Sequence, residues 1–138
     1  MKLKDFTKLP ALYRNREEKV NAVTISNVVV NEENGGETVT ISAVTNGKHE
    51  TKIQVNRKTG ETKVFCDCES FYFEFSYVLF KHKALLNEEY FISLWKRAKP
   101  RKTSRRKNPY NIPAGCKHVI RLARYTISHL HKYLTLRR

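Results

Sequence analysis

Alternating hydrophobic and polar positions in the first half of the chain predict four β-strands. β-Branched residues are dense over positions 20–30, and alternation follows over 38–45, 49–55 and 61–65. Short polar segments separate the four, and the Asn46-Gly47 pair is the strongest hairpin signal in the chain. The expected structure is an antiparallel meander with one apolar face, which another layer must cover.

Two segments of the second half are candidates for that covering layer. Aromatic and aliphatic residues crowd positions 71–86, and their later spacing favours a helix over about 70–86 whose aromatic side chains belong to the core. Positions 117–134 have helical spacing, with apolar residues on one face and cations largely on the other. The predicted fold class is α+β, an antiparallel meander packed by one or two helices.

The length of 138 residues suits one compact domain. Residues 1–16 are basic and broken by Pro10, and we expect an N-terminal arm whose apolar residues dock on a neighbouring surface. Residues 17–138 would form the single α+β domain. No apolar run is long enough to span a bilayer, and the N-terminus lacks a secretory signal, so we expect a cytoplasmic protein with no membrane partner.

Charge is unevenly distributed along the chain. Lysine and arginine number 27 against 13 acidic residues, a formal net charge of +14. Residues 1–89 contain 13 basic and all 13 acidic residues, whereas residues 90–138 contain 14 basic residues and no aspartate or glutamate. Solvated surfaces normally mix both signs, so a purely cationic segment suggests a polyanionic partner. We expect this partner to be the phosphate backbone of DNA or RNA.

The densest cationic stretch is an insert at about 96–110, which contains Pro100 and is expected to be a loop. Further cations follow on the polar face of the last predicted helix. Trp95 and Tyr110 flank the basic run and could either stack on unpaired bases or anchor the loop to the core. The residues expected to contact phosphates are Lys96, Arg97, Lys99, Arg101, Lys102, Arg105, Arg106, Lys107, Arg121, Arg124 and Lys132.

All three cysteines and one histidine fall into two short motifs. Cys66 and Cys68 stand at the end of a predicted strand, and Cys116 and His118 at the start of a predicted helix. Residues i and i+2 of an extended backbone point to the same side, so Cys66 and Cys68 can face one point. At a helix start, Cys116 and His118 can likewise converge, before regular helical rotation separates them. Three thiolates and one imidazole make a complete tetrahedral zinc set, and such a closed site is structural. The alternative is three buried small side chains and an incidental histidine.

The sequence Cys66-Asp67-Cys68, followed after a gap by Cys116-Lys117-His118, resembles the SWIM-type zinc finger, whose pattern is Cys-x-Cys and then Cys-x-His. The resemblance covers roughly residues 60–130 and implies a ββα-like module built on a structural zinc ion, with nucleic acid or protein as its partner. The aromatic run after Cys68, the long insert and the Gly-Cys-Lys-His sequence also resemble small proteins of tailed bacteriophages.

Two functions are compatible with these features. The first is a non-enzymatic, zinc-stabilised module that binds the nucleic-acid backbone. The second is a structural or assembly protein of a phage virion, whose arm and insert bind neighbouring subunits or packaged DNA. The sequence contains no glycine-rich phosphate loop and no nucleophile elbow, so we expect neither an enzyme nor a small-molecule substrate.

Overall fold

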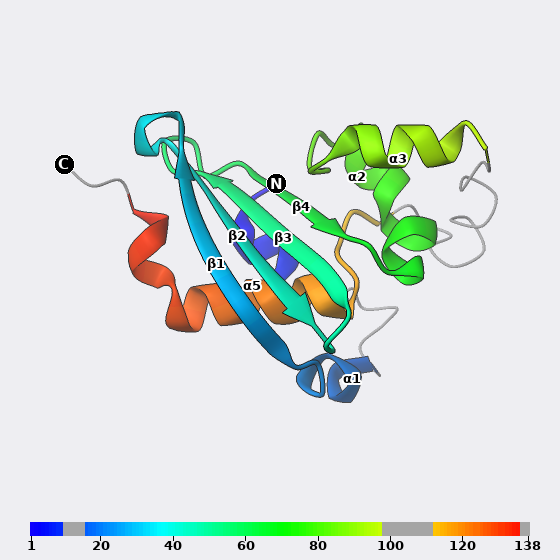
Figure 1. Ribbon diagram of the computed structural model, residues 1–138, viewed down its shortest axis with the longest axis horizontal. Helices are drawn as coiled ribbons and strands as arrows, with labels where there is room; N and C mark the ends of the chain where they lie inside the picture. Colours follow the sequence, from blue (N-terminus) through cyan, green and yellow to red (C-terminus); the bar gives the residue numbers. More distant parts are fainter. Residues whose placement is uncertain (10–15, 98–111, 136–138) are drawn as a thin grey trace.

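The computed structural model has the predicted α+β architecture, with a four-stranded antiparallel sheet and a set of short helices (Figure 1). It describes residues 1–9, 16–97 and 112–135. The strands neighbour one another in the order of the sequence, so the sheet is a simple meander. Its members are β1 (Ile25–Glu33), β2 (Thr38–Thr45), β3 (His49–Asn56) and β4 (Thr62–Cys66).

The β2–β3 hairpin forms where the sequence predicts it. Thr45 pairs with His49, and Asn46 and Gly47 between them have φ angles of 52° and 70°. Two successive residues with positive φ match the twist of a tight hairpin, and asparagine and glycine are the residues that accept them at least cost. This turn brings the tip of the hairpin to a fixed place beside the end of β4.

The first strand begins later than predicted. Val20 belongs to the short helix α1 (Glu17–Asn21), where it is fully buried, and β1 starts only at Ile25. The strand then continues to Glu33, through residues expected to form a polar turn. Its pairing with β2 shifts register between Ser26 and Val29, so β1 contains a bulge.

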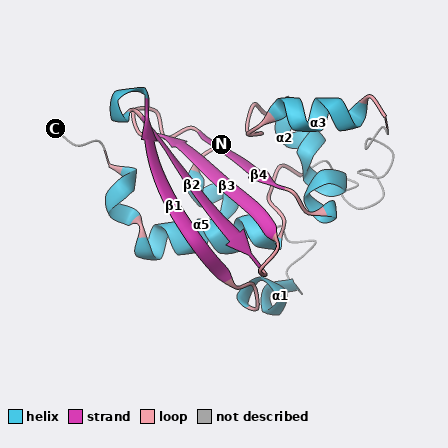
Figure 2. Ribbon diagram, viewed as in Figure 1, coloured by secondary structure: helices cyan, strands magenta, loops and turns pink. Residues whose placement is uncertain are grey.

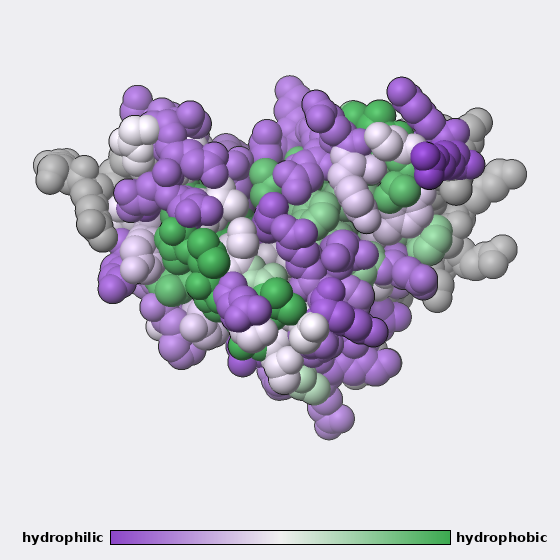
Figure 3. All heavy atoms as spheres, in the orientation of Figure 1, coloured by the Kyte–Doolittle hydropathy of each residue, from purple (hydrophilic) through white to green (hydrophobic). Residues whose placement is uncertain are grey.

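Helix α5 (Lys117–His129) covers one face of the sheet (Figure 2). It buries its apolar face, including Val119, Leu122 and Ala123, against alternate residues of β2, β3 and β4. The other sheet face is more polar, with scattered hydrophobic residues (Figure 3). The predicted helix to residue 134 is wrong at its end, because α5 stops at His129 and a 3₁₀ turn, His131–Leu134, follows.

The single helix predicted over 70–86 is wrong. A π-helix, Phe71–Ser76, passes into α2 (Tyr77–Lys81), and the chain then turns so that Leu85 forms a bridge with Val64 of β4. A further helix, α3 (Glu88–Trp95), was not predicted. The expected core role of the aromatic run is confirmed, because several of its side chains are buried, among them Phe71, Phe75 and Leu79.

The first nine residues pack on the chain's own domain. A 3₁₀ helix, Leu3–Phe6, lies against α5, with Leu3 buried and Phe6 fully buried. Lys2 bridges to Glu61 at the start of β4. The remainder of the predicted arm, residues 10–15, lies outside the described residues.

Candidate metal centre

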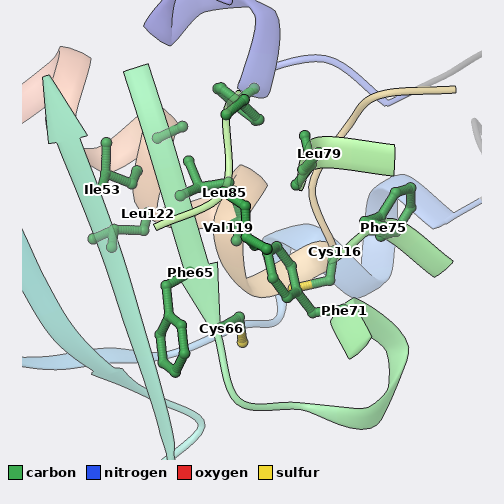
Figure 4. Close-up of a cluster of buried hydrophobic side chains, with 14 of the residues drawn as sticks. Ile53, Phe65, Cys66, Phe71, Phe75, Leu79, Leu85, Cys116, Val119 and Leu122 are labelled. Carbon is green, nitrogen blue, oxygen red and sulfur yellow. The ribbon is translucent and has the colours of Figure 1, made fainter. Parts of the chain in front are cut away.

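Four side chains from two distant segments meet at the end of the sheet. Cys66 ends β4, Cys68 lies in the loop that follows, and Cys116 and His118 stand at the start of α5. All four are buried, and their sulfur and ring nitrogen atoms lie within 4.8 Å of one another. Figure 4 shows Cys66 and Cys116 at the edge of the apolar core, beside Phe71. Within the described residues this is the only such group.

The spacing of these atoms fits a tetrahedral ion. With a Zn–S bond of about 2.3 Å and a Zn–N bond of about 2.0 Å, neighbouring ligand atoms are about 3.5 to 3.8 Å apart. The Nδ1 atom of His118 lies 3.7 Å from Sγ of Cys66 and 3.7 Å from Sγ of Cys116. The three cysteines are free of disulfide bonds. The cluster can therefore hold a metal ion, and a thiolate-rich set of this kind suits zinc.

Gly115 allows the chain to enter α5 with Cys116 in this place. A Cβ atom on residue 115 would lie 2.5 Å from Cγ1 of Val119, which is fully buried under the sheet. Only a residue without a side chain fits there. Cys116 then takes the N-cap position of α5, where the positive end of the helix dipole favours a thiolate.

Hydrogen bonds from neighbouring groups orient two of the sulfur atoms. The backbone N–H of Phe71 donates to Sγ of Cys68 over 3.3 Å, as the chain turns into the π-helix. The hydroxyl of Thr51, which lies opposite Cys66 in the β3–β4 pairing, donates to Sγ of Cys66 over 3.5 Å. Thr51 is itself 3.0 Å from the hydroxyl of Thr45, and both threonines are fully buried.

The side of His118 that faces away from the cluster contacts the β2–β3 hairpin. Nε2 of His118 lies 3.3 Å from Nδ2 of Asn46, whose Oδ1 accepts a hydrogen bond from the backbone N–H of Thr24. The ring of His49 is 4.8 Å from that of His118 and is paired with Asp67 over 2.9 Å. These contacts leave Nδ1 of His118 directed at the sulfur atoms.

The pKa values of the three thiols are shifted in different directions. Hydrogen bonds from Cys116 and Cys66 lower the pKa of the Cys68 thiol well below its ordinary value. A hydrogen bond with Cys116 lowers the pKa of Cys66, but the bond to Cys68, burial and the charge of Cys68 outweigh it and raise that pKa to about 12. Burial, followed by the bonds and charges of the other two cysteines, raises the pKa of Cys116. A bound dication is what would let all three ionise together.

The residues expected to contact phosphates are distributed over several surfaces. Lys96, Arg97 and Lys132 are exposed. Arg121 is half-buried, whereas Arg124 donates to the backbone oxygen of Thr7 over 2.8 Å and to the carboxylate of Glu17. The other six residues, together with Tyr110, lie outside the described part of the chain: Lys99, Arg101, Lys102, Arg105, Arg106 and Lys107.

Fold and cluster together define an α+β protein with a buried centre of three cysteines and one histidine that can hold a metal ion. No protein-family model matches the chain, and neither a curated protein nor a solved structure matches it. Among the described helices, none has the length and apolar character needed to cross a membrane.

Proposed function

We propose that this protein is a non-enzymatic nucleic-acid-binding protein whose buried cluster holds a structural zinc ion. The observation that carries the proposal is the charge of residues 90–138, which contain 14 basic side chains and no acidic one. Such a segment gains free energy by replacing condensed counterions on a phosphate backbone, whatever the base sequence.

Zinc supports this role by fixing the segment that carries the basic run. Cys68 and Cys116 stand at the two ends of residues 69–115, and both are ligands of the same cluster. With four protein ligands the ion has no open position, so it would supply cross-linking and neutralise thiolate charge rather than activate a water. The zinc ion would then fix the chain on both sides of the basic run.

Among the described cations, the exposed ones are the better candidates for phosphate contacts. Arg97 at the end of α3 and Lys132 after α5 are exposed. The guanidinium of Arg124 is already engaged by Glu17 and Thr7, so a phosphate would have to compete with a carboxylate there.

The burial of Leu3 and Phe6 in the chain's own core supports a binding module over an assembly protein with a free N-terminal arm.

Metal content tests the zinc part of the proposal. We expect the purified protein to contain zinc in a ratio of about one ion per cluster, and Cys116→Ser to lose both the metal and the cooperative unfolding transition. His82→Ala is the matched control, because His82 is exposed at the end of α2, outside the cluster. A folded wild-type protein without metal would contradict a structural zinc ion.

Salt-dependent binding tests the nucleic-acid part. Fluorescence anisotropy with a labelled oligonucleotide should give a log–log dependence of affinity on salt with a slope of roughly 0.7 to 0.9 per phosphate neutralised. The double variant Arg97→Gln/Lys132→Gln should reduce that slope, whereas Lys48→Gln/Lys58→Gln, on exposed turns of the sheet, should leave it unchanged. The absence of binding by the wild-type protein at low salt would overturn the function.

A further inference from the structure

A groove with aromatic walls lies between the end of β4, the π-helix and α3. Its volume is about 350 Å³, and its walls include Tyr72, Phe73, Tyr90 and Leu94. Clefts that bind small ligands or single side groups have volumes of about 300 to 1,000 Å³. Hydrophobic residues also reach the surface over α2 and α3 in Figure 3.

The floor of the groove is rigid because its rings pack around Phe91. Phe91 is fully buried, and the ring of Tyr90 meets it edge-on at 5.0 Å and meets Phe65 edge-on at 5.5 Å. Tyr72 stacks parallel to Phe91 at 6.4 Å. Tyr90 is nonetheless 47% exposed, so a tyrosine whose ring is held by two aromatic neighbours remains accessible to solvent.

The lining of the groove includes charges of both signs. Asp67 and Glu69 follow β4, and Arg97 comes directly after α3. Lys96 is exposed beside Arg97. A phosphate would therefore be attracted to Arg97 and repelled by Glu69, whose carboxylate can accept hydrogen bonds from the amino groups and ring N–H groups of bases.

We propose that this groove takes an unpaired base of a single-stranded nucleic acid, stacked on Tyr90, with its phosphates toward Lys96 and Arg97. The inference rests on the proposed function and adds to it a preference for single strands. A base in a duplex has both faces covered by its neighbours, whereas an unpaired base can stack on a protein ring whatever its identity. Lys96 and Arg97 are followed in the sequence by further basic residues.

Trp95, which the sequence suggested either as a base-stacking residue or as an anchor of the loop, packs within the aromatic cluster. Its ring contacts Tyr77 at 5.6 Å and Phe80 at 5.3 Å, and it lies 6.2 Å from Phe91. These contacts make Trp95 an anchor of the aromatic cluster, and they leave Tyr90 as the exposed platform.

The test compares wild-type protein, Tyr90→Ala and Tyr90→Phe in the zinc-loaded full chain. Binding is measured by anisotropy with labelled single-stranded DNA, single-stranded RNA and duplex DNA of equal length, the first two distinguishing the sugar. We expect single strands to bind more tightly than the duplex, Tyr90→Ala to weaken single-strand binding about fivefold or more, and Tyr90→Phe to retain it. Ile127→Ala, which removes another exposed hydrophobic residue, is the control that should change nothing.

Ultraviolet cross-linking of the wild-type protein to the single strand provides a second readout, independent of variant stability. Cross-links at Tyr72, Phe73 or Tyr90 support the inference, and cross-links confined to other residues overturn it. Equal salt-dependent binding of single strands and duplex, with no effect of Tyr90→Ala, also overturns the inference but leaves the proposed function standing. The groove would then belong to another partner, such as a basic peptide. If the wild-type protein binds no nucleic acid, the proposed function and this inference both fail.

Discussion

Asn46 serves two parts of the molecule at once. Its backbone adopts the left-handed conformation of the β2–β3 turn, with φ of 52°, and its side chain contacts His118. Nδ2 of Asn46 can only donate a hydrogen bond, so this contact needs an unprotonated Nε2 and places the ring proton on Nδ1, the nitrogen that faces the sulfur atoms. The geometry of the turn and the tautomer of His118 therefore depend on the same residue.

Asn46→Gly separates these two roles, because glycine retains the turn and removes the contact with His118. We expect the affinity for zinc to rise, as measured by competition with a chromophoric chelator, because the ring proton can then lie on Nε2, as ligation through Nδ1 requires. Asn34→Gly is the matched control, since Asn34 also has a positive φ, 53°, but lies in the β1–β2 turn. Equal zinc affinity for the two variants would mean that the contact with Asn46 does not set the tautomer of His118.

The pKa shifts of the three thiols predict how many protons zinc displaces. The pKa of Cys66 is raised to about 12 and that of Cys116 is raised as well, while the pKa of Cys68 is lowered. A folded metal-free protein at neutral pH therefore holds two thiol protons, and zinc should release about two. An unfolded metal-free chain, with ordinary thiol pKa values of about 8.5, should release nearly three.

Calorimetry in buffers of different ionisation enthalpy counts these protons. Because each released proton adds about a factor of ten in affinity per pH unit, zinc should bind more tightly as the pH rises. Affinity that is independent of pH between about 6 and 8, where the thiols of Cys66 and Cys116 stay protonated in the metal-free protein, would contradict thiolate ligation.

The ligands could be predicted from the sequence, and their neighbours could not. Cys66 with Cys68, and Cys116 with His118, are local pairs that can each converge on one point, the second because Cys116 has an extended backbone at the N-cap of α5, before the helical rotation begins. Thr51 reaches the cluster only because it lies opposite Cys66 in the β3–β4 register. Its role depends on strand pairing, which local spacing does not specify.

At the scale of elements, the aromatic run shows why one long helix was predicted and two short elements with a turn are found. In the π-helix, Phe71–Ser76, the extra residue in each turn moves side chains to different faces from those of an α-helix. The helical run then ends at Lys81, because Lys83 has φ of 57° and Leu85 pairs with β4. Both interruptions involve contacts with β4 and with the loop that carries Cys68, and the periodicity of the sequence contains no information on such contacts.

Helices α1 and α5 are joined by the bond between Glu17 and Arg124. The hydrogen bond from Arg124 lowers the pKa of Glu17 from its ordinary value of 4.5. A carboxyl group whose pKa falls on folding stabilises the folded state above its ordinary pKa, and this contribution is lost as the pH falls through the folded value. The joint between the two helices should therefore weaken in acid.

We expect Glu17→Gln to be less stable than the wild-type protein at neutral pH and to converge with it in acid, where the wild-type carboxylate is protonated. Urea midpoints measured across the acid range test this. Glu18→Gln, an exposed change in the same helix, is the control and should follow the wild-type profile. A constant gap between Glu17→Gln and the wild-type protein at every pH would exclude the ion pair as its cause.

At the scale of the whole molecule, the cluster joins the end of β4 to the start of α5 and closes the intervening segment. We expect chelation to make the chain susceptible to trypsin, including at Lys81 and Lys83 near the end of α2, because the metal-free protein loses its cooperatively folded structure. Mass spectrometry of the fragments identifies the cleavage sites, and re-addition of zinc should restore protection. Identical cleavage with and without chelator would mean that the core alone holds the segment.

The two points at which the segment after α3 is attached to the domain determine where changes in chain length can be tolerated. The chain leaves α3 at Arg97 and returns at Ile112, on a base held by the core and the cluster. Doubling the length of a flexible loop costs only about 0.6 kcal/mol of closure entropy. Grafted or lengthened sequences between these points should therefore be tolerated, whereas inserting a single residue between Cys66 and Cys68 would move one ligand to the opposite side of the backbone.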